Sequence, residues 1–409
     1  MKRKVIILST ALLIVVGGGG YLKLRDTNKE NELISARTLK EDRLVGVYIE
    51  DGDDYTKIDQ IPNSGYTFNS EKSYCKIGDK ELDMMITYDM NTKTLSIAPV
   101  TSKGTKCYLY FDKETALKDT ILANSKVNTG TPDFSRVATT DEGLYKAQDD
   151  WGDSYYFRGA VTNNWVKFAG FYWRIIRING DGSIRLIYNG TSAKATGDST
   201  MINSSQAFNS RYNRSEYVGY MYTMNKQHGN TTNSSIKEVL DGWYHNELLN
   251  YANQINTEGG FCGDRVSSNW SSQPNGEIYY EAYERLYDNK IPTLKCSNSL
   301  DLYTVSGSSE GNKALTNPIG LITADEVAMA GGVYDEINTS YYLNNNTDYW
   351  TMSPFYVESS TAHMFYVRSN GSLRNIWPDS ELGVRPVINL KADATIKSGN
   401  GTSSTPYEV

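Results

Sequence analysis

The chain has 409 residues, with 41 lysines and arginines against 48 aspartates and glutamates, which gives a net charge of −7. That length is enough for two or three domains, and the acidity argues against a nucleic-acid-binding protein, because such binding depends on basic contacts to phosphates. The chain also contains 31 tyrosines but only 10 phenylalanines, and it is rich in asparagine and glycine. Recognition surfaces use these residue types, so the composition favours a displayed binding surface.

The N-terminus has the pattern of an export signal. Three basic residues at positions 2–4 precede an uncharged, largely apolar stretch over residues 5–22. This stretch is close to the length that crosses a bilayer, and the leading positive charges favour a cytoplasmic N-terminus. We therefore predict a signal anchor, or transmembrane segment, over residues 1–22 of a single-pass protein of the cell membrane, with the bulk of the chain extracellular. Cleavage within residues 17–20, which would release a secreted protein, remains the alternative.

The next part of the chain predicts a stalk and a small domain. Residues 23–43 are charged and nearly free of aromatic side chains, which suits a solvated stalk with some helix. Residues 44–112 contain short alternating runs, which predict a small antiparallel β domain with a hairpin connection at residues 89–93. A short helix is expected at residues 116–123, within a linker over residues 113–140.

The four cysteines fit an exported chain, because disulfides persist outside the cytosol. They fall as Cys75 and Cys107, then Cys262 and Cys296, and neither pair has a C-x-x-C spacing. Among the three possible connectivities we favour the two local disulfides, 75 with 107 and 262 with 296. The histidines lie in no metal-ligand array, so we expect no zinc site; they are His228, His245 and His363.

A second domain is expected over residues 141–395, followed by a C-terminal tail over residues 396–409. A strand over residues 171–178 meets an Asn-Gly-Asp-Gly turn and returns as residues 183–188. Both faces of the first of these strands carry apolar side chains, which predicts a central strand.

Two helices are indicated by capping boxes, in which a hydroxyl side chain and a glutamate three positions later cap the helix N-terminus. Ser235 and Glu238 form the first, and Thr323 and Glu326 form the second. Gly331 is expected to end the second helix in a left-handed conformation.

The last hundred residues contain an unusual aromatic tract over residues 341–355, YYLNNNTDYWTMSPF, which has no lysine, arginine or glutamate. A hairpin turn is expected at residues 369–372, followed by the closing strand LGVRPVINL. Arg385 is the one charged residue of that strand, and we expect it to be buried and paired with Asp325 or Glu326, since an unpaired buried charge is costly.

Six segments together resemble a known family: YYFRGAVTNNWVKFAGFYWRIIRINGDGSIRLIYNG, IPTLKC, GLITADEVAMAGG, YWTMSP, FYVRSNGSL and LGVRPVINL. They are similar to tyrosine- and asparagine-rich exported surface proteins of Gram-positive gut bacteria. The resemblance implies an α+β C-type-lectin-like domain, in the variant shared with formylglycine-generating enzymes. It would be preceded by a small all-β disulfide-stapled domain and an N-terminal transmembrane helix.

The resemblance also implies an exposed ligand face over residues 334–381. The candidate ligand-binding residues on it are Tyr342, Asn344, Asn345, Asp348, Tyr349, Trp350, His363, Arg374 and Trp377. Strand alternation should bury about half of the aromatic side chains in this region and expose the rest.

We therefore expect a non-catalytic protein that recognises a host or bacterial surface protein or glycan by aromatic stacking and amide hydrogen bonds. Two alternatives stay open: an enzyme of the formylglycine-generating type acting through Cys262 and Cys296, and a structural envelope protein. No cofactor is expected. Calcium stays open because residues 273–275 (Gln-Pro-Asn) and Glu277 resemble half of the calcium site of sugar-binding lectins, although no Trp-Asn-Asp motif follows.

Overall fold

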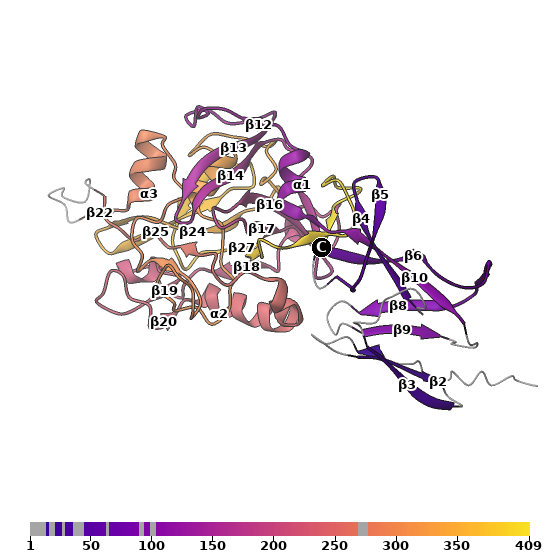
Figure 1. Cartoon of the computed structure of the whole chain (residues 1–409). Coiled ribbons are helices and arrows are strands. Elements are labelled where there is room, and N and C mark those ends of the chain that lie inside the picture. The colour runs from indigo at the N-terminus through magenta and orange to yellow at the C-terminus, as the bar shows by residue number, and fades with distance from the viewer. Residues whose placement is uncertain are drawn as a thin grey trace, which may run out of the picture. The chain divides into compact units, whose positions relative to one another are not determined.

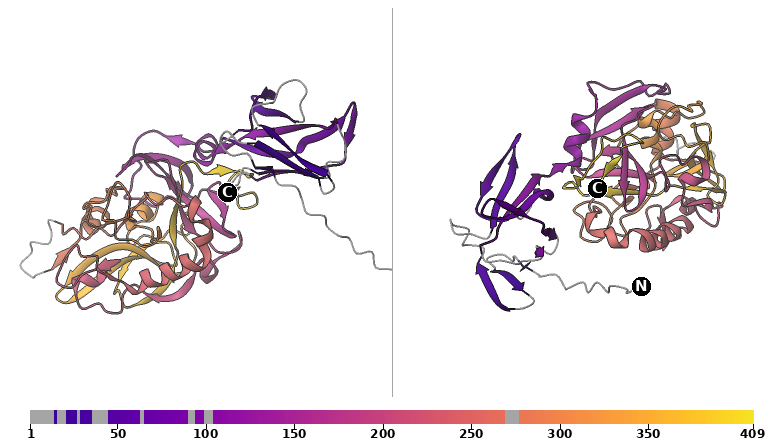
Figure 2. Two further views of the ribbon diagram at one scale, coloured as in Figure 1. Left: turned by 60° about the horizontal axis from the view of Figure 1, so that its bottom comes forward. Right: turned by 90° about the vertical axis from the view of Figure 1, so that its right-hand side faces the viewer.

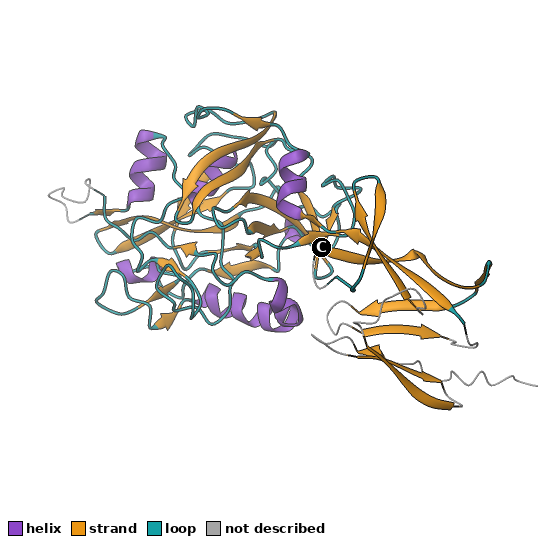
Figure 3. Ribbon diagram, viewed as in Figure 1, coloured by secondary structure: helices purple, strands orange, loops and turns teal. Residues whose placement is uncertain are grey.

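The computed structural model describes residues 14–15, 21–26, 29–35, 45–62, 65–89, 94–98, 104–268 and 277–409. The chain divides into two compact units, Met1–Thr115 and Ala116–Val409 (Figure 1). Strands dominate both units (Figure 3), and the protein is mostly β, with 41% strand and 15% helix.

The first unit is built on a five-stranded sheet in the order β5-β4-β10-β6-β7. The bounds are β4 Val45–Asp51, β5 Asp54–Ile58, β6 Tyr66–Ile77, β7 Lys80–Leu82 and β10 Lys106–Lys113. Strand β10 runs parallel to β4 and antiparallel to β6, so the sheet is mixed rather than wholly antiparallel. Cys75 and Cys107 lie opposite each other on β6 and β10 and form the predicted disulfide.

A second sheet of this unit has the order β1-β9-β8, with β1 Ile14–Val15, β8 Met85–Asp89 and β9 Thr94–Ala98. Asp89 pairs with Thr94, so the two strands of the predicted hairpin are confirmed. Strands β2 (Tyr21–Asp26) and β3 (Lys29–Ser35) pair antiparallel. These strands cover residues 23–26 and 29–35 of the predicted stalk, and residues 36–43, where part of the expected helix could lie, are outside the described residues.

The predicted membrane anchor over residues 1–22 lies largely outside the described residues. Within the part of the chain that the structure describes, no helix is both long enough and apolar enough to span a bilayer.

Most of the stretch expected to be a linker over residues 113–140, from residue 116 onward, belongs to the second unit. Helix α1 (Leu117–Ala123) buries Leu117 and Ile121 in the core of that unit, at the predicted position of a short helix. Strand β12 (Val127–Asn128) then pairs in parallel with β13 (Asp141–Asp149). These buried contacts were invisible in the sequence because the partners of α1 and β12 come later in the chain.

One sheet of the second unit has the order β12-β13-β14-β16-β15-β30, with β17 joining β16 to β28. The further strands are β14 Gly152–Gly159, β15 Trp165–Phe168, β16 Phe171–Ile178, β17 Ile184–Tyr188, β28 Val387–Leu390 and β30 Tyr407–Glu408. Strand β16 pairs with β14, β15 and β17, so its predicted central position is confirmed.

The other main sheet of this unit has the order β18-β27-β24-β25-β26, and β22 also pairs with β24. Its strands are β18 Asn203–Ala207, β22 Ile278–Tyr279, β24 Tyr349–Glu358, β25 Thr361–Val367, β26 Leu373–Ile376 and β27 Glu381–Val384. Short strands elsewhere are β11 Thr115–Ala116, β19 Met221–Tyr222, β20 Thr232–Asn233, β21 Phe261–Cys262, β23 Leu302–Tyr303 and β29 Thr395–Ile396. The β25–β26 pair contains the predicted hairpin turn.

Three helices pack on these sheets: α2 Ser235–Trp243, α3 Glu281–Tyr283 and α4 Ala324–Ala330. Helix α2 is capped by Ser234, one position before the predicted Ser235, and it lies at the periphery of the second unit in each view (Figure 2). Helix α4 has the predicted capping box of Thr323 and Glu326, and Gly331 ends it with a φ of 116°. Further helical turns cover 197–200, 215–218, 244–254 and 284–289.

Candidate functional site

The aromatic tract 341–355 lies in the core. Tyr341, Tyr342, Tyr349 and Trp350 each expose 5% or less of their surface. Tyr349 and Trp350 begin β24, which runs between β25 and β27 and is buried along nearly its whole length. Their polar atoms are satisfied internally, since the Tyr349 hydroxyl donates to the Leu343 carbonyl at 2.9 Å and Trp350 Nε1 donates to the Gln206 carbonyl at 2.6 Å.

Four of the nine candidate ligand residues are therefore corrected, because their side chains are buried against the rest of the domain and line neither of the cavities described below: Tyr342, Asn345, Tyr349 and Trp350. Asn345 donates from Nδ2 to Thr200 Oγ1 at 2.7 Å and so serves a structural role. The other five are partly or fully exposed: Asn344, Asp348, His363, Arg374 and Trp377. The prediction that strand alternation exposes about half of these aromatic side chains is wrong, because both faces of β24 are covered by protein.

Arg385 is buried as predicted, but it pairs with no carboxylate of α4. Its guanidinium donates to the carbonyls of Tyr188 and Leu343 and to Asn189 Oδ1, at 3.1, 2.9 and 2.8 Å, and it lies 4.8 Å from the centre of the Tyr349 ring. Burial lowers its pKa from the ordinary value. Arg385 therefore helps to hold the aromatic tract inside the domain.

The exposed rings of the second unit form a different set. Eight side chains make a continuous series of ring contacts, which we call the aromatic row: Tyr212, Trp377, His363, Tyr356, Tyr279, Tyr283, Tyr287 and Tyr334. Neighbouring ring centres in this series lie between 4.5 and 6.3 Å apart, and Tyr212 with Trp377 and Tyr356 with His363 are stacked. All eight rings are at least partly exposed.

Strand pairing places the middle of the aromatic row. Tyr356 on β24 lies opposite His363 on β25, and opposite Tyr279 on β22 at its other side. The most exposed rings stand toward the two ends of the series, with 49% of Trp377, 40% of Tyr212 and 47% of Tyr287 open to solvent. The backbone pairing of β22, β24 and β25 thus fixes the order of Tyr279, Tyr356 and His363 in the middle of the row.

Asn375 on β26 connects two members of the row. Its amide nitrogen donates to His363 Nδ1 at 3.0 Å, and its carbonyl oxygen accepts a bond of 2.5 Å from the Tyr334 hydroxyl. Burial lowers the pKa of His363 to about 4 and raises that of Tyr334 to about 12. Both rings are therefore uncharged at neutral pH, which suits recognition by stacking and hydrogen bonding.

Six members of the row were missed in the sequence: Tyr212, Tyr279, Tyr283, Tyr287, Tyr334 and Tyr356. A local signal was present for two of them, because Tyr283 and Tyr287 are four positions apart and so share one side of the helical stretch formed by α3 and residues 284–289. Tyr334 and Tyr356 lie within the face predicted over residues 334–381 but were not among its candidate residues, and Tyr212 and Tyr279 come from segments outside that face.

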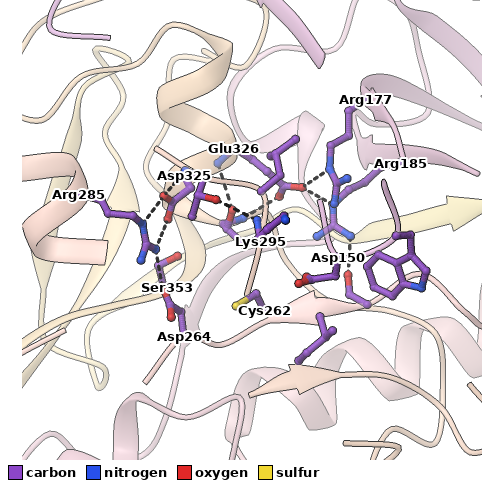
Figure 4. Close-up of a pocket in the computed structure, with 16 residues that line it drawn as sticks. Asp150, Arg177, Arg185, Cys262, Asp264, Arg285, Lys295, Asp325, Glu326 and Ser353 are labelled. Carbon is purple, nitrogen blue, oxygen red and sulfur yellow. Dashed lines mark hydrogen bonds and ion pairs between the residues drawn. The ribbon is translucent and has the colours of Figure 1, made fainter. Parts of the chain in front are cut away.

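A second feature is a small polar cavity of about 30 Å³, which has room for one or two water molecules (Figure 4). Arg285 pairs with Asp264 and Asp325 on one side of it, while Glu326 pairs with Arg177 and Arg185 on the other. These charges neutralise one another. The residues around the cavity are therefore better explained as a network of ion pairs that stabilises the core than as a substrate site.

The Cys262–Cys296 disulfide, which was predicted, borders this cavity. The Cys296 backbone NH donates to the Asp150 carboxylate at 3.1 Å, and burial raises the pKa of Asp150. Chemistry of the formylglycine type would require free thiols at this pair, and here the two sulfurs are joined.

The calcium-like motif at residues 273–275 lies outside the described residues. Across the described ranges, no group of three or more His, Cys, Asp or Glu side chains could hold a metal ion.

Comparison of the chain with protein-family models, with curated proteins and with solved structures finds no match.

Proposed function

We propose that this chain is a cell-surface binding protein whose aromatic row recognises an oligosaccharide without catalysing a reaction. The observation that carries the proposal is the continuous series of eight partly exposed rings, whose three middle members are placed by the pairing of β22, β24 and β25. An exposed apolar surface of this kind is unusual on a soluble domain and typically marks an interaction site.

The polar groups beside the row favour a sugar ligand over a purely apolar one. The Tyr279 hydroxyl donates to Glu277 at 2.7 Å, and the Tyr334 hydroxyl donates to Asn375. Ring faces thus lie next to hydroxyl, amide and carboxylate groups. A sugar has the matching arrangement, because its ring presents C–H faces bordered by hydroxyls, and Tyr and Trp offer a large contact area at little cost in side-chain entropy.

We further propose that the second unit is a C-type-lectin-like domain. Support comes from the closing strand β28, which returns to pair with β17, and from the order of α4 followed by the antiparallel strands β24, β25 and β26. Display at the cell surface through residues 1–22 is part of the same proposal. Two disulfides suit an oxidising compartment and so support export.

A glycan and surface-protein array tests the proposal. The probe proteins are the parent chain, a variant with Trp377→Ala and Tyr287→Ala, and a control with Leu249→Ala, whose side chain is 49% exposed outside the row. We expect the parent and the control to bind the same glycans and the double variant to lose them. Binding only to proteins on the array would show that the ligand is a protein and not a glycan. Equal binding by all three chains would show that the aromatic row does not bind the ligand.

A further inference from the structure

A separate open pocket of about 560 Å³ lies in the second unit, and no member of the aromatic row lines it. It is lined by the segment 131–134, by β13 at residues 146–148, and by the segment 290–295, with Tyr156 and Met329 between them. Its volume lies within the range of small-molecule sites.

The floor of the pocket is apolar. Tyr156, Leu294 and Met329 form a small buried cluster distinct from the main core, and Phe134 packs against it. Ile291, which is 66% exposed, and Pro292 continue this apolar surface at the rim. Such a floor would hold an apolar group of a ligand.

The charged side chains that line the pocket are mostly cationic. They are Lys146, Lys290 and Lys295 against the single carboxylate of Asp133. The Asp133 carboxylate accepts hydrogen bonds from the Ser135 backbone NH at 3.0 Å and from the Ser135 hydroxyl. It also forms an ion pair with Arg136 at 3.3 Å. Lys146 is paired with Asp153 at 2.5 Å, so Lys290 and Lys295 are the two cations of the pocket that remain for an anionic group of a ligand.

The walls of the pocket are held in place by buried polar contacts. Arg158, which is 2% exposed, donates to the carbonyls of Asp133 and Arg136 in one wall and to that of Met329, at 3.2, 3.1 and 3.0 Å. In the opposite wall, the Thr293 backbone NH donates to Asp325 Oδ1 at 3.0 Å. A pocket fixed in this way does not have to be ordered by its ligand, which favours affinity.

We propose that this pocket binds a small amphiphilic carboxylate, with its apolar body on Phe134 and Ile291, over the buried Tyr156 and Met329, and its carboxylate beside Lys290 and Lys295. Lys290 donates to the Leu286 carbonyl at 3.1 Å, which orients its ammonium group and leaves two further N–H donors. The pocket shares no lining residue with the aromatic row, but the two are neighbours, since Lys290 Nζ lies 5.8 Å from the centre of the Tyr287 ring.

The test follows the methyl group of Met329 by NMR in the full chain labelled at its methionine methyls, with Met329→Leu used to assign the signal. The probe is 4-phenylbutyrate, compared with 4-phenylbutan-1-ol, 4-phenylbutylamine and acetate. We expect a saturable shift with phenylbutyrate, at least tenfold weaker binding of the alcohol, and no saturable shift with the amine or with acetate, which lacks the apolar body.

The variant Lys290→Gln with Lys295→Gln should weaken phenylbutyrate binding roughly tenfold or more, because a hydrogen bond to a charged group is worth about that factor. The matched control Lys391→Gln, an exposed lysine outside the pocket, should bind as the parent does. No saturable shift with phenylbutyrate would overturn the proposal. So would equal binding of the acid, alcohol and amine, or unchanged affinity in the double lysine variant.

Discussion

Tyr356 and His363 lie face to face across β24 and β25, with their ring centres 4.5 Å apart. The ring of His363 is partly buried and accepts a hydrogen bond from Asn375 at Nδ1. Protonation of this ring would therefore bury a positive charge and break that hydrogen bond. The pKa of about 4 that burial gives this histidine lies below its ordinary value of 6.5.

This histidine should make stability depend on pH. Below pH 6.5 the unfolded chain takes up a proton that the folded chain does not bind until about pH 4, so acid favours unfolding within that window. We expect the free energy of unfolding, measured with urea, to fall between pH 7 and pH 4.5 more steeply in the parent than in His363→Gln. The exposed histidine control, His245→Gln, should follow the parent, and equal slopes in parent and His363→Gln would contradict the account.

At the scale of elements, Glu326 joins α4 to β16 and β17. Its carboxylate lies 3.1 Å from Arg177 Nε and 2.6 Å from Arg185 Nε, and all three side chains are buried. Although burial opposes ionisation, the two guanidinium groups hold the pKa of Glu326 below its ordinary value. The capping glutamate predicted from sequence is thus also the anion that neutralises two buried arginines.

Removing this charge should destabilise the second unit strongly. Glu326→Gln keeps the size of the side chain but leaves the buried charge of Arg185 without its carboxylate, which typically costs about 3–5 kcal/mol. Calorimetric or urea unfolding should show that loss, whereas Glu336→Gln, an exposed glutamate beyond the same helix, should change stability by less than about 0.5 kcal/mol. A loss of that small size in Glu326→Gln would show that the ion pairs add nothing to stability.

Elements with local signals could be predicted from the sequence. The Asn-Gly-Asp-Gly turn between β16 and β17, the capping box of α4 and the two disulfides all depend on short stretches or on few alternatives. The aromatic row could be predicted only in part: His363 and Trp377 were candidates, but Tyr356 meets Tyr279 only through the long-range pairing of β22 with β24. The burial of residues 341–355 was missed for the same reason, since the segments that cover β24 are distant in sequence.

At the scale of the molecule, the two units have separate cores. The buried cluster of the first unit contains residues between Val47 and Phe111, and that of the second contains residues from Leu117 onward. Each unit also has its own disulfide. No buried core residue is shared between the two clusters among the described residues.

The second unit should therefore fold alone. We expect a fragment of residues 116–409 to unfold cooperatively, to resist alkylation without reductant, and to bind the same array spots as the full chain. Circular dichroism during heating, thiol titration and the array check these three properties. A fragment that is unfolded at room temperature, or that folds but no longer binds, would show that the first unit takes part in the fold or in recognition.

The central claim is that the aromatic row binds ligand, and its most direct test is the affinity of three folded chains for the glycan bound most strongly on the array. Isothermal titration would compare the parent, Trp377→Ala with Tyr287→Ala, and Leu249→Ala, each with its melting temperature measured. Loss of two stacking rings should weaken binding at least tenfold, since each aromatic contact contributes about 0.5–1.5 kcal/mol beyond the area that it buries. Unchanged affinity in a double variant that melts like the parent would contradict the account.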